Sequence, residues 1–148
     1  AIASTTGAGG LNGDAEVVIR IAGAHPHVVG LMTPGTGPEG FAISPNGKWA
    51  VAPLLLGTGA RHDAYNYTKG GEAVLMAVGA DGGPGVTGRA KLGGLPEGVA
   101  FSPGNDYVYI GNYMDRDLQT FRIDGGKLVQ VNRMKLPGQP ASMRGPAR

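Results

Sequence analysis

The stretch Pro38-Glu39-Gly40-Phe41-Ala42-Ile43-Ser44-Pro45 occurs a second time in the chain, as Pro96-Glu97-Gly98-Val99-Ala100-Phe101-Ser102-Pro103. The two copies share six of eight residues, and both differences exchange one apolar residue for another. A third, degenerate copy begins at Pro140-Ala141-Ser142-Met143, so the copies follow one another at spacings of 58 and 44 residues. Repetition at such a period is typical of proteins built from stacked units of similar structure.

Each full copy of this motif is followed by the pattern of a β-hairpin. A polar turn, Asn46-Gly47-Lys48 or Gly104-Asn105-Asp106, precedes an alternating apolar run at residues 49–52 or 107–110. Such a turn between apolar runs favours two antiparallel strands. Two more strand candidates follow in each unit, at residues 72–78 and 86–92 in the first and at 118–123 and 128–136 in the second. Each unit is therefore predicted to hold four short strands.

The composition agrees with many short strands joined by tight turns. Glycine and proline supply 28 and 11 of the 148 residues, and they lie between apolar runs instead of in one biased tract. No stretch of 11 or more residues keeps a helical apolar stripe free of glycine or proline, so we expect essentially no helix. A four-stranded antiparallel unit that recurs at spacings of 44 to 58 residues is typical of a β-propeller blade.

The predicted fold class is all-β: a β-propeller with about two complete four-stranded blades and partial blades at both ends. We expect a partial blade at residues 1–34 that holds strands two to four, a blade with a long loop insertion at 35–93, a blade at 94–137, and the start of another at 138–148. Closed propellers have about four to eight blades, and an open stack would expose apolar blade faces. We expect these residues to be part of a longer chain that forms a larger propeller, with self-association into a closed ring as the alternative.

The second unit resembles the YVTN repeat of bacterial propellers, a group that includes the lactonase-like seven-bladed propellers. The resemblance rests on the copy at 96–103, on Tyr107-Val108-Tyr109-Ile110-Gly111-Asn112-Tyr113 and on Leu118-Gln119-Thr120-Phe121-Arg122-Ile123-Asp124, and it covers most of residues 35–144. The name-giving motif departs from the family as Tyr109-Ile110-Gly111-Asn112, and the first unit carries an insertion between its second and third strands. The resemblance implies a periplasmic or secreted location.

In a propeller, the loops that surround one end of the central channel normally carry the function. Glu39 and Glu97 occupy equivalent positions there, so the two carboxylates could hold a cation or act as acid and base. Alternatively, each glutamate could cap its own turn by accepting backbone N–H bonds.

The loop at residues 59–69 holds more polar and aromatic side chains than a connection needs, and loops of this kind often bind ligands. The alternative is a surface flap held by its own side chains. The corresponding loop of the second unit lies between Asn112 and Asp117. Together, the ligand-binding candidates are Glu39, Arg61, His62, Asp63, Tyr65, Glu97, Asn112 and Arg116.

Several classes of chemistry find no support in the residues. The chain has no cysteine, His62 and Asp63 are adjacent, and His25 and His27 flank a proline in an expected turn, so we predict no metal site and no cofactor. A net charge of +2 gives no basis for nucleic-acid binding. No apolar run approaches the roughly 18 residues of a membrane span.

These observations favour a propeller scaffold that binds a protein partner or a small ligand through loops at the channel mouth. The resemblance implies two alternatives, a lactonase-like hydrolase that acts on a cyclic ester and the propeller subunit of a periplasmic redox enzyme. No residue is identified as catalytic. Further partners are the remaining blades of the same propeller or other copies of the chain.

Overall fold

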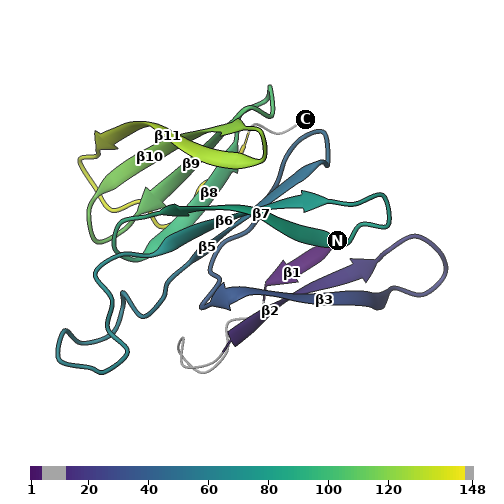
Figure 1. The fold of residues 1–148 in the computed structure, drawn as a ribbon, viewed down its shortest axis with the longest axis horizontal. Helices are drawn as coiled ribbons and strands as arrows, with labels where there is room; N and C mark the ends of the chain where they lie inside the picture. The colour runs from purple at the N-terminus through teal and green to yellow at the C-terminus, as the bar shows by residue number, and fades with distance from the viewer. Residues whose placement is uncertain (5–12, 146–148) are drawn as a thin grey trace.

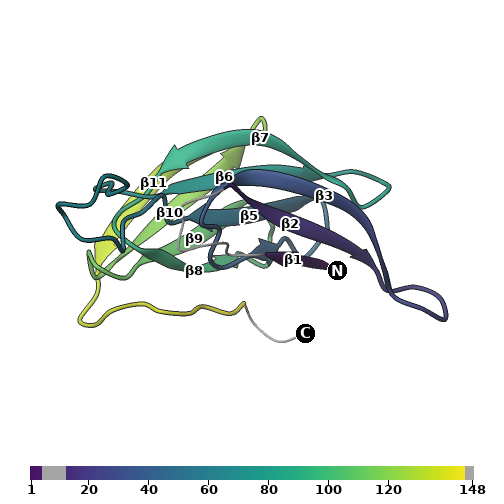
Figure 2. The ribbon, with the colours of Figure 1, turned by 90° about the horizontal axis from the view of Figure 1, so that it is seen from below.

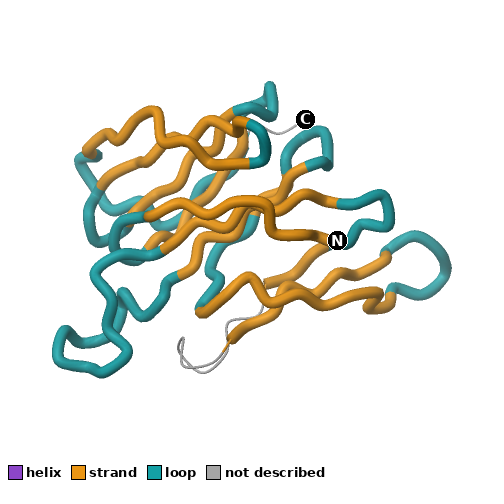
Figure 3. The backbone as a smooth tube through the Cα atoms, viewed as in Figure 1, coloured by secondary structure: helices purple, strands orange, loops and turns teal. Residues whose placement is uncertain are grey.

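The computed structural model describes residues 1–4 and 13–145 of the chain. These residues form strands and loops, as Figure 3 shows, and the described elements are all strands. Within the same residues, no helix is long and apolar enough to cross a membrane. The predicted all-β class is confirmed.

Eleven strands arise from the described residues, close to the positions that the apolar runs predict. The strands are β1 (Ile2–Ser4), β2 (Gly13–Arg20), β3 (His27–Thr36), β4 (Ala42–Ile43), β5 (Trp49–Leu54), β6 (Glu72–Val78), β7 (Pro84–Lys91), β8 (Pro96–Phe101), β9 (Tyr107–Asn112), β10 (Asp117–Asp124) and β11 (Lys127–Lys135).

The strands pair in chain order into three antiparallel sheets that follow one another in space (Figure 1). The first sheet holds β1 to β3, the middle sheet holds β4 to β7, and the last sheet holds β8 to β11. Two four-stranded sheets preceded by a three-stranded one are the arrangement that the repeat predicts. The exact blade boundaries, at residues 34, 93 and 137, remain a prediction.

A register shift recurs at the same place in all three sheets. It lies between Val18 and Ile19 in β2, between Leu75 and Met76 in β6, and between Thr120 and Phe121 in β10. The residues that precede these shifts pair with Ile2, Val51 and Tyr109 on the neighbouring strands. The first sheet is therefore equivalent, strand for strand, to the last three strands of the other two sheets.

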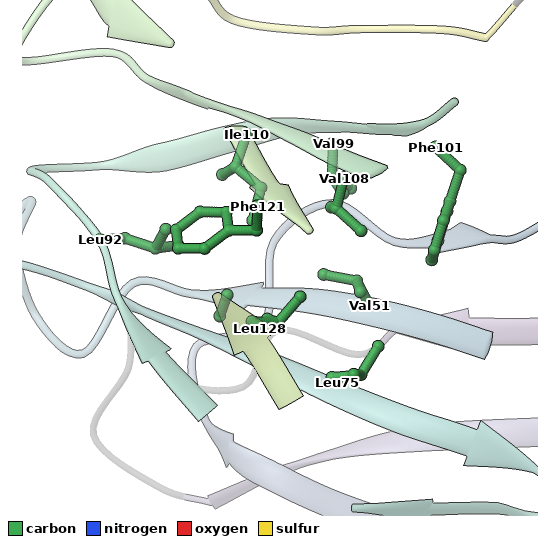
Figure 4. Packing of buried hydrophobic residues seen from close by; sticks show 10 residues of the cluster. Val51, Leu75, Leu92, Val99, Phe101, Val108, Ile110, Phe121 and Leu128 are labelled. Carbon is green, nitrogen blue, oxygen red and sulfur yellow. The ribbon is translucent and has the colours of Figure 1, made fainter. Parts of the chain in front are cut away.

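The middle sheet is buried on both faces, because its alternate side chains pack against different neighbours. Ala52, Val74 and Met76 belong to the cluster that Met32 of β3 also contacts. Val51 and Leu75 point the other way and pack with residues of the last sheet. Figure 4 shows this second cluster, whose buried members are Val51, Ala73, Leu75, Leu92, Val99, Phe101, Val108, Ile110, Phe121 and Leu128.

Glycine follows glutamate in both full copies of the repeat because the first strands of neighbouring sheets, which we call the inner strands, approach closely at this point. Gly40 has a φ of +84°, and a Cβ on it would collide with the carbonyl oxygen of Glu97. A Cβ on Gly98 would come within 3.1 Å of the backbone nitrogen of Met143. The third copy thus lies against the second as the second lies against the first, and its segment runs beneath β8 in Figure 2.

Candidate functional site

The predicted site loops gather at one end of the sheets. Leu55 N donates to Gly37 O at 2.7 Å, Leu95 N donates to Thr58 Oγ1 at 3.0 Å, and Tyr113 N donates to Leu95 O at 3.0 Å. These bonds join the loops at residues 37–40, 55–71, 92–97 and 112–117, which we call the channel-mouth end. All eight candidate residues lie in these loops, and the long loop between β5 and β6 projects from the sheets in Figure 1.

All three copies of the repeat meet at this end around one hollow. Its volume is about 260 Å³, and each copy supplies three consecutive residues to its lining. We call it the repeat hollow; it is lined by Glu39, Gly40, Phe41, Glu97, Gly98, Val99, Ala141, Ser142 and Met143. Glu39 is exposed, Glu97 is partly buried, and alanine takes the glutamate position in the third copy.

The carboxyl group of Glu97 responds to its position in the repeat hollow. Burial raises the pKa of the Glu97 carboxyl, and the negative charge of Glu39 raises it further. No ion pair of the described residues involves either glutamate, and no hydrogen bond recorded among them ends on either carboxylate. The turn-capping alternative therefore finds no support, whereas both carboxylates are free to accept hydrogen bonds from a ligand.

The loop at residues 55–71 is folded on itself. Consecutive turns are closed by backbone hydrogen bonds, such as Ala64 N to Arg61 O at 2.9 Å. Arg61 and Asp63 form an exposed ion pair at 2.9 Å, and the rings of His62 and Tyr67 lie 4.6 Å apart. Tyr65 is 91% exposed. The loop is thus a flap held by its own side chains, as the alternative interpretation predicts, and it presents one aromatic ring to solvent.

Asn112 has no exposed surface and is part of a buried polar network. Its Nδ2 donates to Asp117 Oδ1 at 2.7 Å and to Gln119 Oε1 at 2.8 Å, while its Oδ1 accepts from Gly93 N at 2.9 Å. These bonds fix the end of β9 against β10 and against the loop that enters β8. The Asn112 side chain therefore holds the channel-mouth loops in place, and a contact between Asn112 and a ligand stays a prediction.

Asp117 anchors the charged side of the same network. Burial alone would raise the pKa of its carboxyl, but hydrogen bonds from Asn112 and Arg133, together with the charge of Arg133, hold the pKa below its ordinary value of 3.8. Arg133 Nε lies 2.8 Å from Asp117 Oδ2, and its other guanidinium end lies 2.7 Å from Asp115. Sequence reasoning missed this cluster because Arg133 is 16 residues away and comes close only when β10 pairs with β11.

The remaining candidates have ordinary surroundings. Arg116 occupies the tight turn between β9 and β10 with a φ of +52°, and its carbonyl accepts from Leu136 N at 2.8 Å. His25 and His27 lie at the exposed turn between β2 and β3, where His27 Nδ1 is 3.1 Å from the His25 carbonyl. Residues 1–4 and 13–145 contain no group of three or more histidine or acidic side chains that could hold a metal ion.

The apolar lining of the repeat hollow was not among the predicted site residues. Phe41, Val99 and Met143 occupy the same position in the three copies, directly after the glycine or serine. The repeat itself could have identified these three positions, because equivalent residues of neighbouring copies are expected to lie at equivalent places in the fold.

Solved structures of bacterial proteins show the same arrangement of sheets. A candidate 6-phosphogluconolactonase from Bacteroides fragilis matches with a TM-score of 0.72 at 18% identity, over 90% of this chain and 35% of that one. A periplasmic gluconolactonase from Pseudomonas aeruginosa matches with a TM-score of 0.67 at 17% identity, over 90% and 37%. Hydrazine synthase from Kuenenia stuttgartiensis matches with a TM-score of 0.59 at 17% identity, over 97% and 48%. No protein-family model and no curated protein matches the chain.

Three twisted antiparallel sheets that stack through their faces, with their repeats around one hollow, define a partial β-propeller. Its fold is that of the lactonase-like propellers, so the resemblance of the repeat is confirmed at the level of the fold. The chain spans 35 to 37% of the length of the two lactonase structures.

Proposed function

We propose that this chain is the part of a propeller that binds a small polyhydroxylated ligand in the repeat hollow. The observation that carries the proposal is the meeting of three repeat copies around one space that is lined by Glu39 and Glu97 and, beside them, by Phe41 and Met143. Carboxylates accept hydrogen bonds from hydroxyl groups, and the partly buried Phe41 and Met143, which also line the hollow, can pack against the C–H faces of a sugar-like ring. A volume of about 260 Å³ suits a single ring better than a drug-sized molecule.

A polyol is favoured over a metal ion as the ligand. Calcium takes six to eight oxygen ligands, whereas the repeat hollow supplies two carboxylates, and the third copy has Ala141 instead of a glutamate. Arg61 to Tyr65 lie on the long loop, outside the hollow lining. We assign these residues to contacts with a protein partner, with the exposed Tyr65 ring as the anchor.

A second function, hydrolysis of a cyclic ester, is favoured by the raised pKa of Glu97. A carboxyl group whose pKa is shifted toward neutral can serve as a general acid or base. The matched structures named as lactonases support this candidate at the level of the fold. The redox-subunit alternative and a periplasmic or secreted location stay predictions from the resemblance.

One experiment separates these functions. A sugar lactone such as gluconolactone is added to the isotope-labelled 148-residue chain, and amide shifts and acid release are followed against spontaneous hydrolysis. Saturable shifts at residues 39–41 and 97–99 without extra acid release support binding alone, and acid release above the background supports the hydrolase.

Two variants locate the signal. Glu97→Gln is expected to weaken the amide shifts or the acid release, whichever is observed. Glu72→Gln removes the same charge from β6, and it is expected to leave that signal unchanged. A wild-type chain with neither signal would overturn both functions.

A further inference from the structure

A second hollow lies at the end of the sheets opposite the channel mouth. The turns that join β4 to β5, β8 to β9 and β10 to β11 lie at this end, because successive connections of an antiparallel sheet alternate between its two ends. The hollow has a volume of about 650 Å³, and its lining comes entirely from the middle and last sheets and their turns. We call it the turn hollow; its lining includes Asn46, Trp49, Thr87, Asp106, Ile123 and Gly126.

Trp49 supplies the aromatic surface of the turn hollow. Its indole packs at the edge of the cluster between the middle and last sheets, and its Cη2 atom lies 3.7 Å from the Cβ position of Gly126. The side chain is only partly buried, and no hydrogen bond of the described residues ends on its Nε1 atom. Every buried side-chain nitrogen of the described residues has a partner, so this N–H lies at the surface. The indole thus offers an apolar ring and an unpaired donor.

Polar groups of the same lining are also left without partners. Asp106 Oδ1 accepts from Ser102 Oγ at 2.9 Å, whereas no hydrogen bond or ion pair of the described residues ends on Asp106 Oδ2. Asn46 Oδ1 accepts from Ser44 Oγ at 2.8 Å and from Lys48 N at 3.0 Å, which leaves the Asn46 Nδ2 group free to donate. The turn hollow therefore combines an aromatic ring with unpaired donors and an unpaired acceptor.

Hydrogen bonds between the turns fix the shape of the turn hollow. Asn46 N donates to Asn105 Oδ1 at 2.7 Å, which ties a turn of the middle sheet to a turn of the last sheet. Ile123 N donates to Asp106 O at 2.8 Å, which holds the same turn of the last sheet against β10. A ligand therefore meets groups that are already in place, and this lowers the entropic cost of binding.

We propose that the turn hollow binds a neutral disaccharide, with one sugar ring stacked on the Trp49 indole. The C–H groups of a sugar ring gain dispersion energy against an aromatic surface. Hydroxyl groups both donate and accept, so they can pair with Trp49 Nε1, Asn46 Nδ2 and Asp106 Oδ2. A volume of about 650 Å³ lies within the usual range of small-molecule sites. The proposal is independent of the function assigned to the repeat hollow, which lies at the other end of the sheets.

A cation is the other ligand that a tryptophan beside a carboxylate can hold. Asp106 is the one charged residue of the lining, and it would attract a positive group. A cation accepts no hydrogen bonds, however, so Trp49 Nε1 and Asn46 Nδ2 would stay unpaired beside it. The two free donors therefore favour a hydroxylated ligand.

Trp49 is the single tryptophan of the chain, so its fluorescence reports on the turn hollow directly. Cellobiose and maltose are titrated into the 148-residue chain, and N-acetyltryptophanamide in the same solutions corrects for the effect of the sugars on the solvent. We expect a saturable change in emission with at least one of the two disaccharides. No saturable change with either would overturn the proposal, and a saturable change with tetramethylammonium chloride in their place would overturn it in favour of a cation site.

Matched carboxylate variants locate the binding. Asp106→Asn keeps an acceptor for Ser102 Oγ but removes the free carboxylate oxygen, and it is expected to weaken binding about tenfold. Asp124→Asn removes the same charge from an exposed ion pair with Arg122 outside the lining, and it is expected to leave the affinity unchanged. The emission of each variant without sugar checks that the contact between the sheets is kept. Equal affinities of the two variants would overturn the proposal.

The function assigned to the repeat hollow fails or holds separately. Glu97→Gln is expected to leave the response of Trp49 to a disaccharide unchanged, because Glu97 lines the repeat hollow alone. A loss of the Trp49 response in Glu97→Gln would place the saccharide in the repeat hollow and would overturn the assignment to the turn hollow.

Discussion

Replacing Asn112 by alanine tests whether the buried amide network stabilises the last sheet. The change removes donors at 2.7 Å to Asp117 and at 2.8 Å to Gln119, and one acceptor for Gly93 N. Gly93 N keeps a second acceptor, Gln119 Oε1 at 3.1 Å. A bond to a charged group contributes about 1.5–3 kcal/mol and a neutral one about 1 kcal/mol. We therefore expect Asn112→Ala to lower the free energy of unfolding by about 3 kcal/mol.

Urea unfolding followed by tryptophan fluorescence measures this loss. Trp49 is the single tryptophan, and its ring lies 3.7 Å from the Cβ position of Gly126 in the last sheet, so its emission reports on contact between two sheets. Asn132→Ala, on the exposed part of β11, is the matched control and is expected to change stability by less than about 0.5 kcal/mol. A loss below about 1 kcal/mol for Asn112→Ala, with an unchanged urea dependence, would refute the role assigned to the network.

The pH dependence of the same loss provides an independent check. The folded-state pKa of Asp117 lies below its ordinary value of 3.8, so the ionised carboxylate stabilises the folded chain above that pH. This stabilisation declines as the pH falls below 3.8 and through the folded pKa. The difference between wild type and Asn112→Ala is therefore expected to be constant near neutral pH and to shrink in acid.

Three further changes probe the packing and the repeat hollow. Phe121→Ala opens a cavity in the cluster between the middle and last sheets and is expected to cost about 3–5 kcal/mol in urea unfolding; a cost below about 1 kcal/mol would contradict this packing. Gly40→Ala is expected to destabilise more than Gly98→Ala in the same assay, because only Gly40 has a positive φ and faces a fixed carbonyl; equal losses would contradict the close approach. Glu97→Gln is expected to raise the free energy of unfolding at neutral pH, because the folded state disfavours the charge, and the gain should vanish as the pH falls through the raised pKa; a destabilised variant at neutral pH would argue against the shift.

The strands could be predicted from the sequence because each is a short alternating run between turn residues. The turns at Asp81-Gly82-Gly83 and Asp124-Gly125-Gly126 are examples. Gly82, Gly125 and Gly126 have positive φ values, as tight turns require, so the glycines in the sequence mark where one strand ends and the next begins. The propeller fold could be predicted because an eight-residue motif recurs together with the hairpin that follows it. The alternating runs and the repeated motif can both be recognised in the sequence without knowing which distant residues are in contact.

The candidate site was only partly predictable, because burial depends on contacts between distant residues. Asn112 ends a strand just before a short connection that contains Asp115 and Arg116, and asparagine at such a place is typical of an exposed loop. In the structure, the Asn112 side chain is fully buried and hydrogen-bonded to Asp117, Gln119 and Gly93. The closeness of Glu39 and Glu97 was predictable, because the two residues occupy equivalent positions in the repeat. The raised pKa of Glu97 was not predictable, because it depends mainly on how deeply the carboxyl group is buried, and the distance between the two copies in the sequence does not give that burial.

The glycine and the glutamate of the repeat are linked through one packing contact. Because Gly40 lets its strand come against the Glu97 carbonyl, the two copies lie close enough for the Glu39 charge to raise the pKa of Glu97. A third carboxylate at the next position would add to this repulsion in the same hollow, and that position holds Ala141. The degenerate copy thus keeps the packing of the repeat while it limits the negative charge, which is the arrangement that the proposed polyol ligand requires.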